Sequence, residues 1–268
     1  TAADGSGTNY TAGTGTFTIT SDVTLYAKWT IQSYSVTYLA NGGSGSVPTQ
    51  ANVNYNVAFS VAGGSGLSKT GYSFGGWSLT NNGSAISGTY TPTQSITIYA
   101  VWNPNTYTIT YNRNGASGSV TNGDTSYTTG GTAATLPTVG TMTKTGYNFA
   151  GWSTSANGVV IGTSTYTTTA NVTLYAIWNI KNLSISYNKG LAGGVTPTLT
   201  LFPSNSSGNY GTTFNVSSTI DSMTSSNNYA FSGWSDGTNI YAKNDLYRIG
   251  DSNITLTAQW TAIYAVRY

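Results

Sequence analysis

The sequence contains no cysteine, no histidine and no glutamate, since its seven acidic residues are all aspartate. Without cysteine, neither a disulfide framework nor a cysteine-based zinc site can form. Without histidine and glutamate, general acid-base catalysis loses its commonest side chains. We therefore expect a protein that is not an enzyme and that uses no cofactor and no metal ion.

Charged side chains are also scarce, at 6% of the residues, against roughly 25% in ordinary globular proteins. The net charge is only +2 and no run of Lys or Arg could follow a phosphate backbone, so we expect no nucleic acid partner. No run of about eighteen apolar residues is present to span a bilayer, and the start, TAADGSGTNY, lacks the regions of a signal peptide. We expect a mature or excised segment whose export signal or anchor lies outside this sequence.

Three motifs recur in a fixed order along the chain. An opening segment such as YTITY (107–111) is followed by an aromatic motif such as GYNFAGW (146–152) and by a closing segment such as VTLYAIW (172–178). Recurrence at this spacing is typical of tandem modules. The predicted organisation is a C-terminal part of a repeat at 1–30, module 1 at 31–103, module 2 at 104–179, a divergent module 3 with insertions at 180–261, and the first strand of a further repeat at 262–268.

Alternation of side chains assigns the faces of the closing segment. Leu174, Ala176 and Trp178 fall on one side of an extended strand, whereas Thr173 and Tyr175 fall on the other. The first set recurs in every copy and the second set varies, so the recurring face is predicted to be buried. No segment shows a convincing helical periodicity, and we predict a mainly β chain with about four or five short strands per module.

Short polar segments separate the predicted strands. Asn-Gly pairs that begin at 41, 82, 114, 122 and 157 predict turns, because Asn and Gly tolerate positive φ. The linkers between modules are only three or four residues long (TIQS, NPNT, NIKN and TAI), and one of them contains Pro104. We therefore expect neighbouring modules to touch and to form an elongated, semi-rigid rod.

With these motifs the sequence resembles the Listeria-Bacteroides repeat, the module also met as the B-repeat of internalins. The likeness rests on the opening Y-x-V-x-Y strand, on TGYNFAGWS at 145–153 and on ANVTLYAIW at 170–178. The resemblance implies small β-grasp, ubiquitin-like modules in tandem on secreted or surface-attached bacterial proteins, with no catalytic residues. Module 3 departs from the pattern, because SNNY at 226–229 stands where the other modules have KTGY.

The recurring aromatic residues predict the core of each module. An aromatic side chain buries ~150–250 Å², so a few of them supply much of a small core, and burial is favoured over a sugar-stacking platform. The glycine before the motif tryptophan, at 76, 151 and 233, predicts a bulge or a close approach. The predicted core aromatics are Trp29, Tyr72, Phe74, Trp77, Trp102, Tyr147, Phe149, Trp152, Trp178, Tyr229, Phe231, Trp234 and Trp260.

Two other groups of residues are candidates for binding. Tyr26, Tyr99 and Tyr175 lie on the face opposite the predicted core and could contact a glycan, a neighbouring module or a neighbouring fibre, although solvated or inter-module positions are favoured. The segment 241–253 is the most charged place in the chain. Its residues Lys243, Asp245, Arg248 and Asp251 predict a loop with surface ion pairs, with Ca²⁺ or partner binding by the two aspartates as the alternative.

The sequence therefore predicts a structural role. We expect a tandem-repeat stalk or fibre segment of a bacterial cell-surface or secreted adhesin, located outside the cell and non-catalytic. Its partners would be neighbouring modules or identical chains in a fibre, and it would contain no membrane span. The alternative is a carbohydrate- or receptor-binding module that uses the outward tyrosines to bind a host or environmental glycan or protein.

Overall fold

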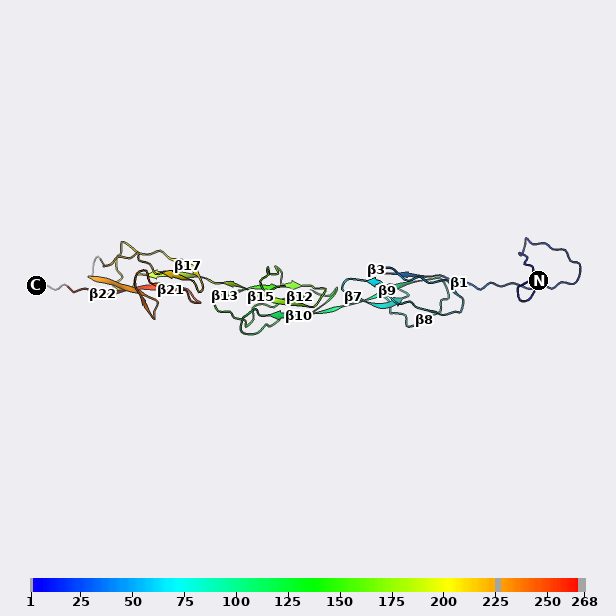
Figure 1. Ribbon diagram of the computed structural model, residues 1–268, viewed down its shortest axis with the longest axis horizontal. Coiled ribbons are helices and arrows are strands. Elements are labelled where there is room, and N and C mark those ends of the chain that lie inside the picture. Colours follow the sequence, from blue (N-terminus) through cyan, green and yellow to red (C-terminus); the bar gives the residue numbers. More distant parts are fainter. Residues whose placement is uncertain (1, 225–227, 265–268) are drawn as a thin grey trace. The chain divides into compact units, whose positions relative to one another are not determined.

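The computed structural model describes residues 2–224 and 228–264, and the chain divides into two compact units, Thr1–Asn105 and Thr106–Tyr268. All regular secondary structure in the described residues is β-strand, and no helix occurs among them (Figure 1). The prediction of a mainly β chain is therefore confirmed. It also follows that no helix in the described part of the chain could cross a membrane.

The first unit contains one mixed sheet, of strand order β2-β9-β7. The central strand β9 pairs parallel with β2 and antiparallel with β7. Two-stranded ladders β1-β4, β3-β6 and β5-β8 complete the unit. The strands are β1 Ser33–Tyr34, β2 Val36–Leu39, β3 Ser44–Gly45, β4 Val53–Asn54, β5 Phe59–Ser60, β6 Leu67–Ser68, β7 Tyr72–Ser78, β8 Thr89–Tyr90 and β9 Ile96–Pro104.

The second unit contains two such sheets, of strand order β11-β10-β15-β13 and β17-β16-β22-β19-β20. The ladders β12-β14 and β18-β21 accompany them. Its strands are β10 Thr106–Asn112, β11 Ser126–Thr128, β12 Ala134–Thr135, β13 Tyr147–Ser153, β14 Thr165–Tyr166, β15 Val172–Ile180, β16 Asn182–Asn188, β17 Ser206–Asn209, β18 Thr213–Asn215, β19 Tyr229–Ser235, β20 Ile240–Tyr241, β21 Leu246–Arg248 and β22 Ile254–Ala262.

The closing strand occupies the centre of all three sheets. In module 2 it lies between the parallel opening strand and the antiparallel aromatic strand, with Ile109 opposite Val172 and Trp152 opposite Ala176. The predicted buried face of the closing strand is confirmed in the complete modules, because Leu174 and Ala176 have no exposed surface. A central strand that is hydrogen-bonded on both edges and apolar on one face anchors each module.

A bulge interrupts the aromatic strand at the same place in each module. The register shifts between Phe149 and Gly151, so that Phe149 and Trp152 both face the core although three positions separate them. Gly151 has φ +139°, and an added Cβ would lie 2.5 Å from the side chain of Val160. The same shift occurs in β7 and β19, which confirms the predicted role of the glycine before the tryptophan.

An irregular loop packs against the core side of each sheet, and the core aromatics hold it in place. In module 1, Tyr38 meets Trp77 edge to face, with ring centroids 4.7 Å apart. The backbone N–H of Ala62 donates to the Tyr38 hydroxyl at 3.1 Å, and the Trp77 indole donates to the Ala62 carbonyl at 2.8 Å. The indoles of Trp152 and Trp234 bond to the corresponding loops in the same way.

The Asn-Gly pairs form turns by two different geometries. Asn41, Asn82, Asn114 and Asn122 have φ values of 49°, 64°, 53° and 61°, as predicted for the left-handed region. Asn157 is not among the described residues with positive φ. A turn is present there as predicted, but the predicted positive φ of its asparagine was wrong. That turn is closed by the N–H of Gly158, which donates to the carbonyl of Ser155 at 3.1 Å.

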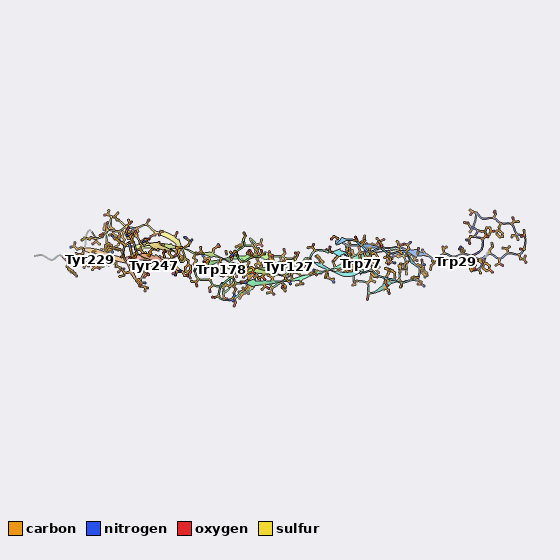
Figure 2. All side chains as sticks on the ribbon, in the orientation of Figure 1. Trp29, Trp77, Tyr127, Trp178, Tyr229 and Tyr247 are labelled. Carbon is orange, nitrogen blue, oxygen red and sulfur yellow. The ribbon has the colours of Figure 1, made fainter. Side chains whose placement is uncertain are left out.

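The segment 1–30, which carries the closing motif of a repeat, forms no paired strand in this structure. Residues 2–30 contain no strand, and Trp29, which was expected in a core, is 89% exposed (Figure 2). Val23 and Leu25, expected on the buried face, are 45% and 58% exposed. In the complete modules the closing strand pairs on both sides, whereas this segment carries neither an opening strand nor an aromatic motif to supply those partners. Of the predicted first strand at 262–268, residues 265–268 lie outside the described residues.

Candidate functional site

Apart from the exposed Trp29, the predicted core aromatics divide into three classes in the structure. The motif tryptophans Trp77, Trp152 and Trp234 are at most 2% exposed and lie in the three core clusters. The residues Phe74, Phe149, Phe231, Trp102, Trp178 and Trp260 are half-buried and pack against those clusters.

The third class is the first tyrosine of the motif, which lies outside the clusters. Tyr72, Tyr147 and Tyr229 are half-buried, and none of them is part of a core cluster. In two modules a lysine lies over the ring instead, with Lys69 Nζ 4.6 Å from the centroid of Tyr72 and Lys144 Nζ 5.0 Å from that of Tyr147. Each ring begins the aromatic strand, at the end where that strand pairs with the last residues of the closing strand, so it lies at the end of the module rather than in its core.

The outward tyrosines have unequal surroundings. Tyr26 is 53% exposed on the segment that lacks strands. Tyr99 and Tyr175 are half-buried in central strands, where Tyr175 pairs with Asn112 on one side and Ser153 on the other. The structure therefore does not bring the three tyrosines into one shared environment.

The charged segment 241–253 was predicted to carry surface ion pairs, and among the described residues it forms one, through Asp251, while its other charged side chains bond to backbone groups or to a serine hydroxyl. The Asp245 carboxylate accepts the N–H of Ala242 at 2.7 Å, and Lys243 donates to the carbonyl of Ile220 at 2.9 Å. Arg248 donates to the carbonyl of Gly211 at 3.3 Å. In the described residues no three acidic side chains gather as metal ligands. The charges instead secure turns and strand ends, and Asp251 bonds outside the segment.

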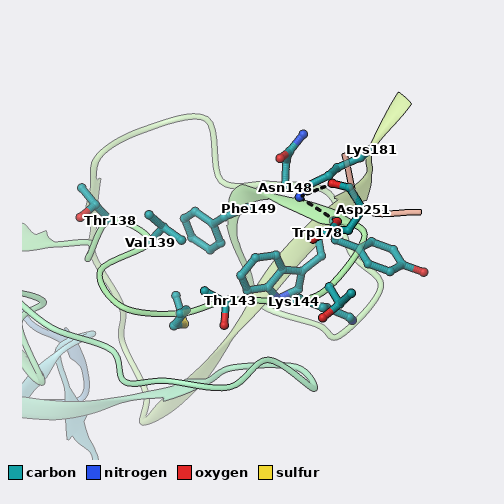
Figure 3. Close-up of a pocket in the computed structure, with 12 residues that line it drawn as sticks. Thr138, Val139, Thr143, Lys144, Asn148, Phe149, Trp178, Lys181 and Asp251 are labelled. Carbon is teal, nitrogen blue, oxygen red and sulfur yellow. Dashed lines mark hydrogen bonds and ion pairs between the residues drawn. The ribbon is translucent and has the colours of Figure 1, made fainter. Parts of the chain in front are cut away.

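Asp251 forms an ion pair across the junction between modules 2 and 3. Its carboxylate lies 2.8 Å from Lys181 Nζ (Figure 3). The same carboxylate accepts the N–H of Gly146 at 2.7 Å. Gly146 directly precedes the aromatic strand of module 2, whereas Asp251 precedes the closing strand of module 3. This contact could not be found from sequence, because Lys181 and Asp251 are 70 positions apart.

Lys181 is the single residue between β15, which ends module 2, and β16, which begins module 3. Its N–H donates to the carbonyl of Gly146 in module 2 at 2.8 Å, and its carbonyl accepts the N–H of Tyr210 in module 3 at 2.9 Å. The backbone and the side chain of this linker are thus bonded to both modules. Two other linkers show part of the same pattern. The N–H of Asn105, between modules 1 and 2, donates to the carbonyl of Gly71 in module 1. The carbonyl of Gln32, at the start of module 1, accepts the N–H of Tyr55 in that module.

Close packing at Gly146 completes the junction. Gly146 is buried with φ +79°, and an added Cβ would lie 2.0 Å from a ring carbon of Tyr210. The ring of Tyr147 lies 6.5 Å from that of Tyr210, centroid to centroid. Only glycine combines this backbone conformation with so close an approach.

The electrostatics of the junction follow from these contacts. The hydrogen bond from Lys181, followed by the hydrogen bond from the backbone of Gly146, lowers the pKa of Asp251 below its ordinary value of 3.8. The side chains of Lys181 and Asp251 are 25% and 45% exposed, so water screens the pair. The pair therefore orients the modules more than it stabilises either of them.

A pocket of about 660 Å³ opens beside this junction. Its walls come from the loop around Val139 and Met142 and from the aromatic strand, and Figure 3 shows Phe149 between Val139 and Trp178. Lys181 and Asp251 line one end of it. Tyr175 is not among the lining residues.

Comparisons with known proteins agree with the repeated architecture. Residues 1–28, 34–101 and 107–177 match the model of the Listeria-Bacteroides repeat domain, whereas 180–261 lie outside the matched ranges. The chain is 30% identical over 254 residues to a protein of Evansella cellulosilytica named "Putative membrane protein", which covers 91% of this chain and 35% of that protein. It is 32% identical over 200 residues to a "Putative Gly-rich membrane protein" of the same organism, with 70% of this chain and 22% of that protein covered.

Proposed function

Because the chain belongs to the Listeria-Bacteroides repeat family, whose modules occur in bacterial surface proteins, we propose that it is a spacer, a stalk or fibre segment of a cell-surface or secreted adhesin. One observation carries this proposal: the linker between modules 2 and 3 is a single residue whose backbone is hydrogen-bonded to both modules. A linker held in this way transmits orientation from one module to the next. A binding domain on a flexible tether has no need of it.

The architecture of the module fits this role. We infer a β-grasp arrangement in which a loop, bonded to the core tryptophan, takes the place of the covering helix. The strand order β17-β16-β22-β19-β20, with its parallel pair β16-β22, supports this inference. The opening and closing strands are neighbours in the sheet, so that tension applied at the two ends of a module loads their interstrand hydrogen bonds together. We propose that such modules, joined end to end, form an elongated rod.

The proposed spacer has no catalytic function. The sequence offers neither histidine nor glutamate, and each aspartate of the charged segment bonds to a backbone N–H, Asp251 bonding in addition to the Lys181 ammonium. The proposed partners are neighbouring modules or identical chains in a fibre, outside the cell. The low content of charge supports contacts that change little with salt concentration.

Electron microscopy of intact producing cells tests this proposal. Antibodies against this chain, carried on gold particles, should mark evenly spaced rows along thin surface projections. Deleting the codons for residues 31–179 should shorten the projections without removing them, because it takes out two modules and keeps the remainder in frame. Diffuse label, antigen found only in the medium, or projections of unchanged length would contradict the spacer proposal.

A further inference from the structure

The aromatic strand β13 has an open outer edge. It is the last strand in the order β11-β10-β15-β13. The carbonyl of Gly146 accepts a hydrogen bond from Lys181, so Gly146 directs its backbone groups toward β15. Backbone groups alternate in direction along an antiparallel strand, so Asn148 also points toward β15. Tyr147 and Phe149 therefore direct their backbone groups toward the outer edge. Within the described residues, no hydrogen bond from outside the sheet reaches the N–H or the carbonyl of Phe149. These groups are available to another extended chain.

Module 3 shows what fills the same edge. The N–H of Phe231 donates to the carbonyl of Ser222 at 2.9 Å, and the N–H of Thr224 donates to the carbonyl of Tyr229 at 2.9 Å. Met223 and Ala230 form an antiparallel bridge between these two bonds. Residues 222–224 therefore lie along the outer edge of β19 as a short extended segment.

The two modules differ in the residue that pairs with the first tyrosine of the aromatic strand. Four residues separate Thr224 from Tyr229 in module 3, whereas two separate Lys144 from Tyr147 in module 2. The shorter turn is closed by the Tyr147 N–H on the carbonyl of Lys144 at 3.0 Å. The chain before it pairs elsewhere, since Ser117 and Thr143 exchange backbone hydrogen bonds of 2.9 and 3.2 Å. Within the described residues, module 2 thus has no segment of its own beside Phe149, whereas further along the same edge the N–H of Ile161 donates to the carbonyl of Trp152 at 2.7 Å.

The pocket of about 660 Å³ lies along this edge. Val139, which is 38% exposed, lies beside Phe149 in its lining (Figure 3), and Met142 and Thr143 line it as well. A residue placed opposite Phe149 on an added strand would direct its side chain to the same side of the sheet as Phe149. An apolar side chain at that position therefore has room and apolar walls in module 2.

We propose that the outer edge of β13 binds an extended peptide segment of a partner protein, antiparallel to the strand. One carbonyl of the peptide accepts the N–H of Phe149, and the N–H two residues further on donates to the carbonyl of Tyr147. An apolar side chain of the peptide enters the pocket lined by Val139 and Phe149. Main-chain bonds of this kind supply affinity, and the pocket supplies selectivity. This inference does not depend on the spacer proposal.

A synthetic peptide derived from the chain itself provides the probe. The blocked peptide of residues 218–224, STIDSMT, contains the segment that lies on the edge in module 3, and its Ser222→Val form places an apolar side chain opposite Phe149. Hydrogen exchange of the full chain, resolved by NMR, reports on the Phe149 amide. We expect saturating Ser222→Val peptide to slow exchange of that amide by about tenfold or more.

Three comparisons separate strand addition from unspecific adhesion. N-methylation of the peptide nitrogen at the Thr224 position, which removes the donor to Tyr147, should weaken binding about tenfold. Val139→Lys on the protein should weaken binding about tenfold, because it places a charge in the pocket. Val159→Lys is the matched control, since Val159 is 91% exposed in the same module and does not line the pocket. It should bind as the native chain does.

Several results would overturn the proposal. If the exchange rate of the Phe149 amide is unchanged at a peptide concentration of about 1 mM, which would detect even a weak complex with a Kd in that range, strand addition is excluded. Equal binding by the N-methylated peptide, or by the Val139→Lys chain, would exclude the assigned geometry. Protection of Phe149 that rises with protein concentration and needs no peptide would assign the edge to a second copy of this chain instead.

Discussion

The ammonium of Lys181 lies 2.8 Å from a carboxylate oxygen of Asp251, and this pair joins two neighbouring modules. The same carboxylate bonds to the N–H of Gly146, whose carbonyl accepts the N–H of Lys181. The single linker residue is therefore held by a closed set of contacts with both modules. For a protein proposed to act as a spacer, these residues at the junction control how stiffly module 3 is held against module 2.

Removing the carboxylate should loosen the junction without unfolding either module. Asp251→Ala deletes the ion pair and the hydrogen bond to Gly146, whereas Asp251→Asn keeps an oxygen for Gly146 and loses only the charge. We expect ¹⁵N relaxation to show modules 2 and 3 tumbling more independently in Asp251→Ala, with a smaller change in Asp251→Asn. Asp22→Asn is the control, because it removes one carboxylate charge from the segment 1–30, outside modules 2 and 3. Identical relaxation in all four chains would show that the carboxylate does not orient the modules.

Acid should release the same junction. The pKa of Asp251 is lowered by Lys181 and Gly146, so folding into the junction favours the ionised form. Its contribution is complete above the ordinary pKa of 3.8 and is lost as the pH falls through the lowered value. We expect independent tumbling to appear in the native chain below about pH 4 and to show no such step in Asp251→Ala. A native chain whose relaxation is constant through that range would contradict the assignment.

The bulge glycine should be needed for stability. Gly151→Ala forces a Cβ toward Val160 at a φ of +139°, which should cost about 1–3 kcal/mol of the free energy of unfolding. Gly162→Ala is the matched control, because no atom lies within 4 Å of its Cβ position and its φ is not positive. Denaturant unfolding followed by tryptophan fluorescence measures both changes. A loss in Gly151→Ala no larger than in Gly162→Ala would refute the account of the bulge.

Replacing a buried tryptophan by alanine should destabilise the protein far more than replacing an exposed one. Trp152 is 2% exposed, so Trp152→Ala should destabilise module 2 by about 3–5 kcal/mol through the cavity it leaves. Trp29 is 89% exposed, and Trp29→Ala should change the free energy of unfolding by less than about 0.5 kcal/mol. Thermal unfolding of the two variants provides the comparison. A large loss in Trp29→Ala would show that the segment 1–30 packs as a repeat after all.

The strands and their faces could be predicted from sequence because two signals coincide there. The alternation of apolar residues fixes which side of a strand is buried, and the recurrence of Trp77, Trp152 and Trp234 marks the same position in three modules. The bulge was also predictable, because glycine before the tryptophan tolerates a backbone that other residues avoid.

The junction and the open edge could not be predicted, because both depend on contacts between distant segments. The sequence marked Asp251 only as one of several charged residues in 241–253, and only the fold brings it to Lys181. The replacement of KTGY by SNNY at 226–229 was visible in the sequence, but the pairing of residues 222–224 with the aromatic strand was not. Trp29 was misassigned because its motif is complete, whereas its burial requires partner strands that the segment 1–30 does not carry.

Small-angle X-ray scattering of the 268-residue chain tests the spacer account most directly. A compact globular domain of this length has a radius of gyration of about 18 Å. The account predicts a markedly larger value with a long tail in the distance distribution, and a further change in Asp251→Ala as the junction loosens. A radius near about 18 Å, unchanged in that variant, would contradict the proposal that tandem modules form an extended spacer.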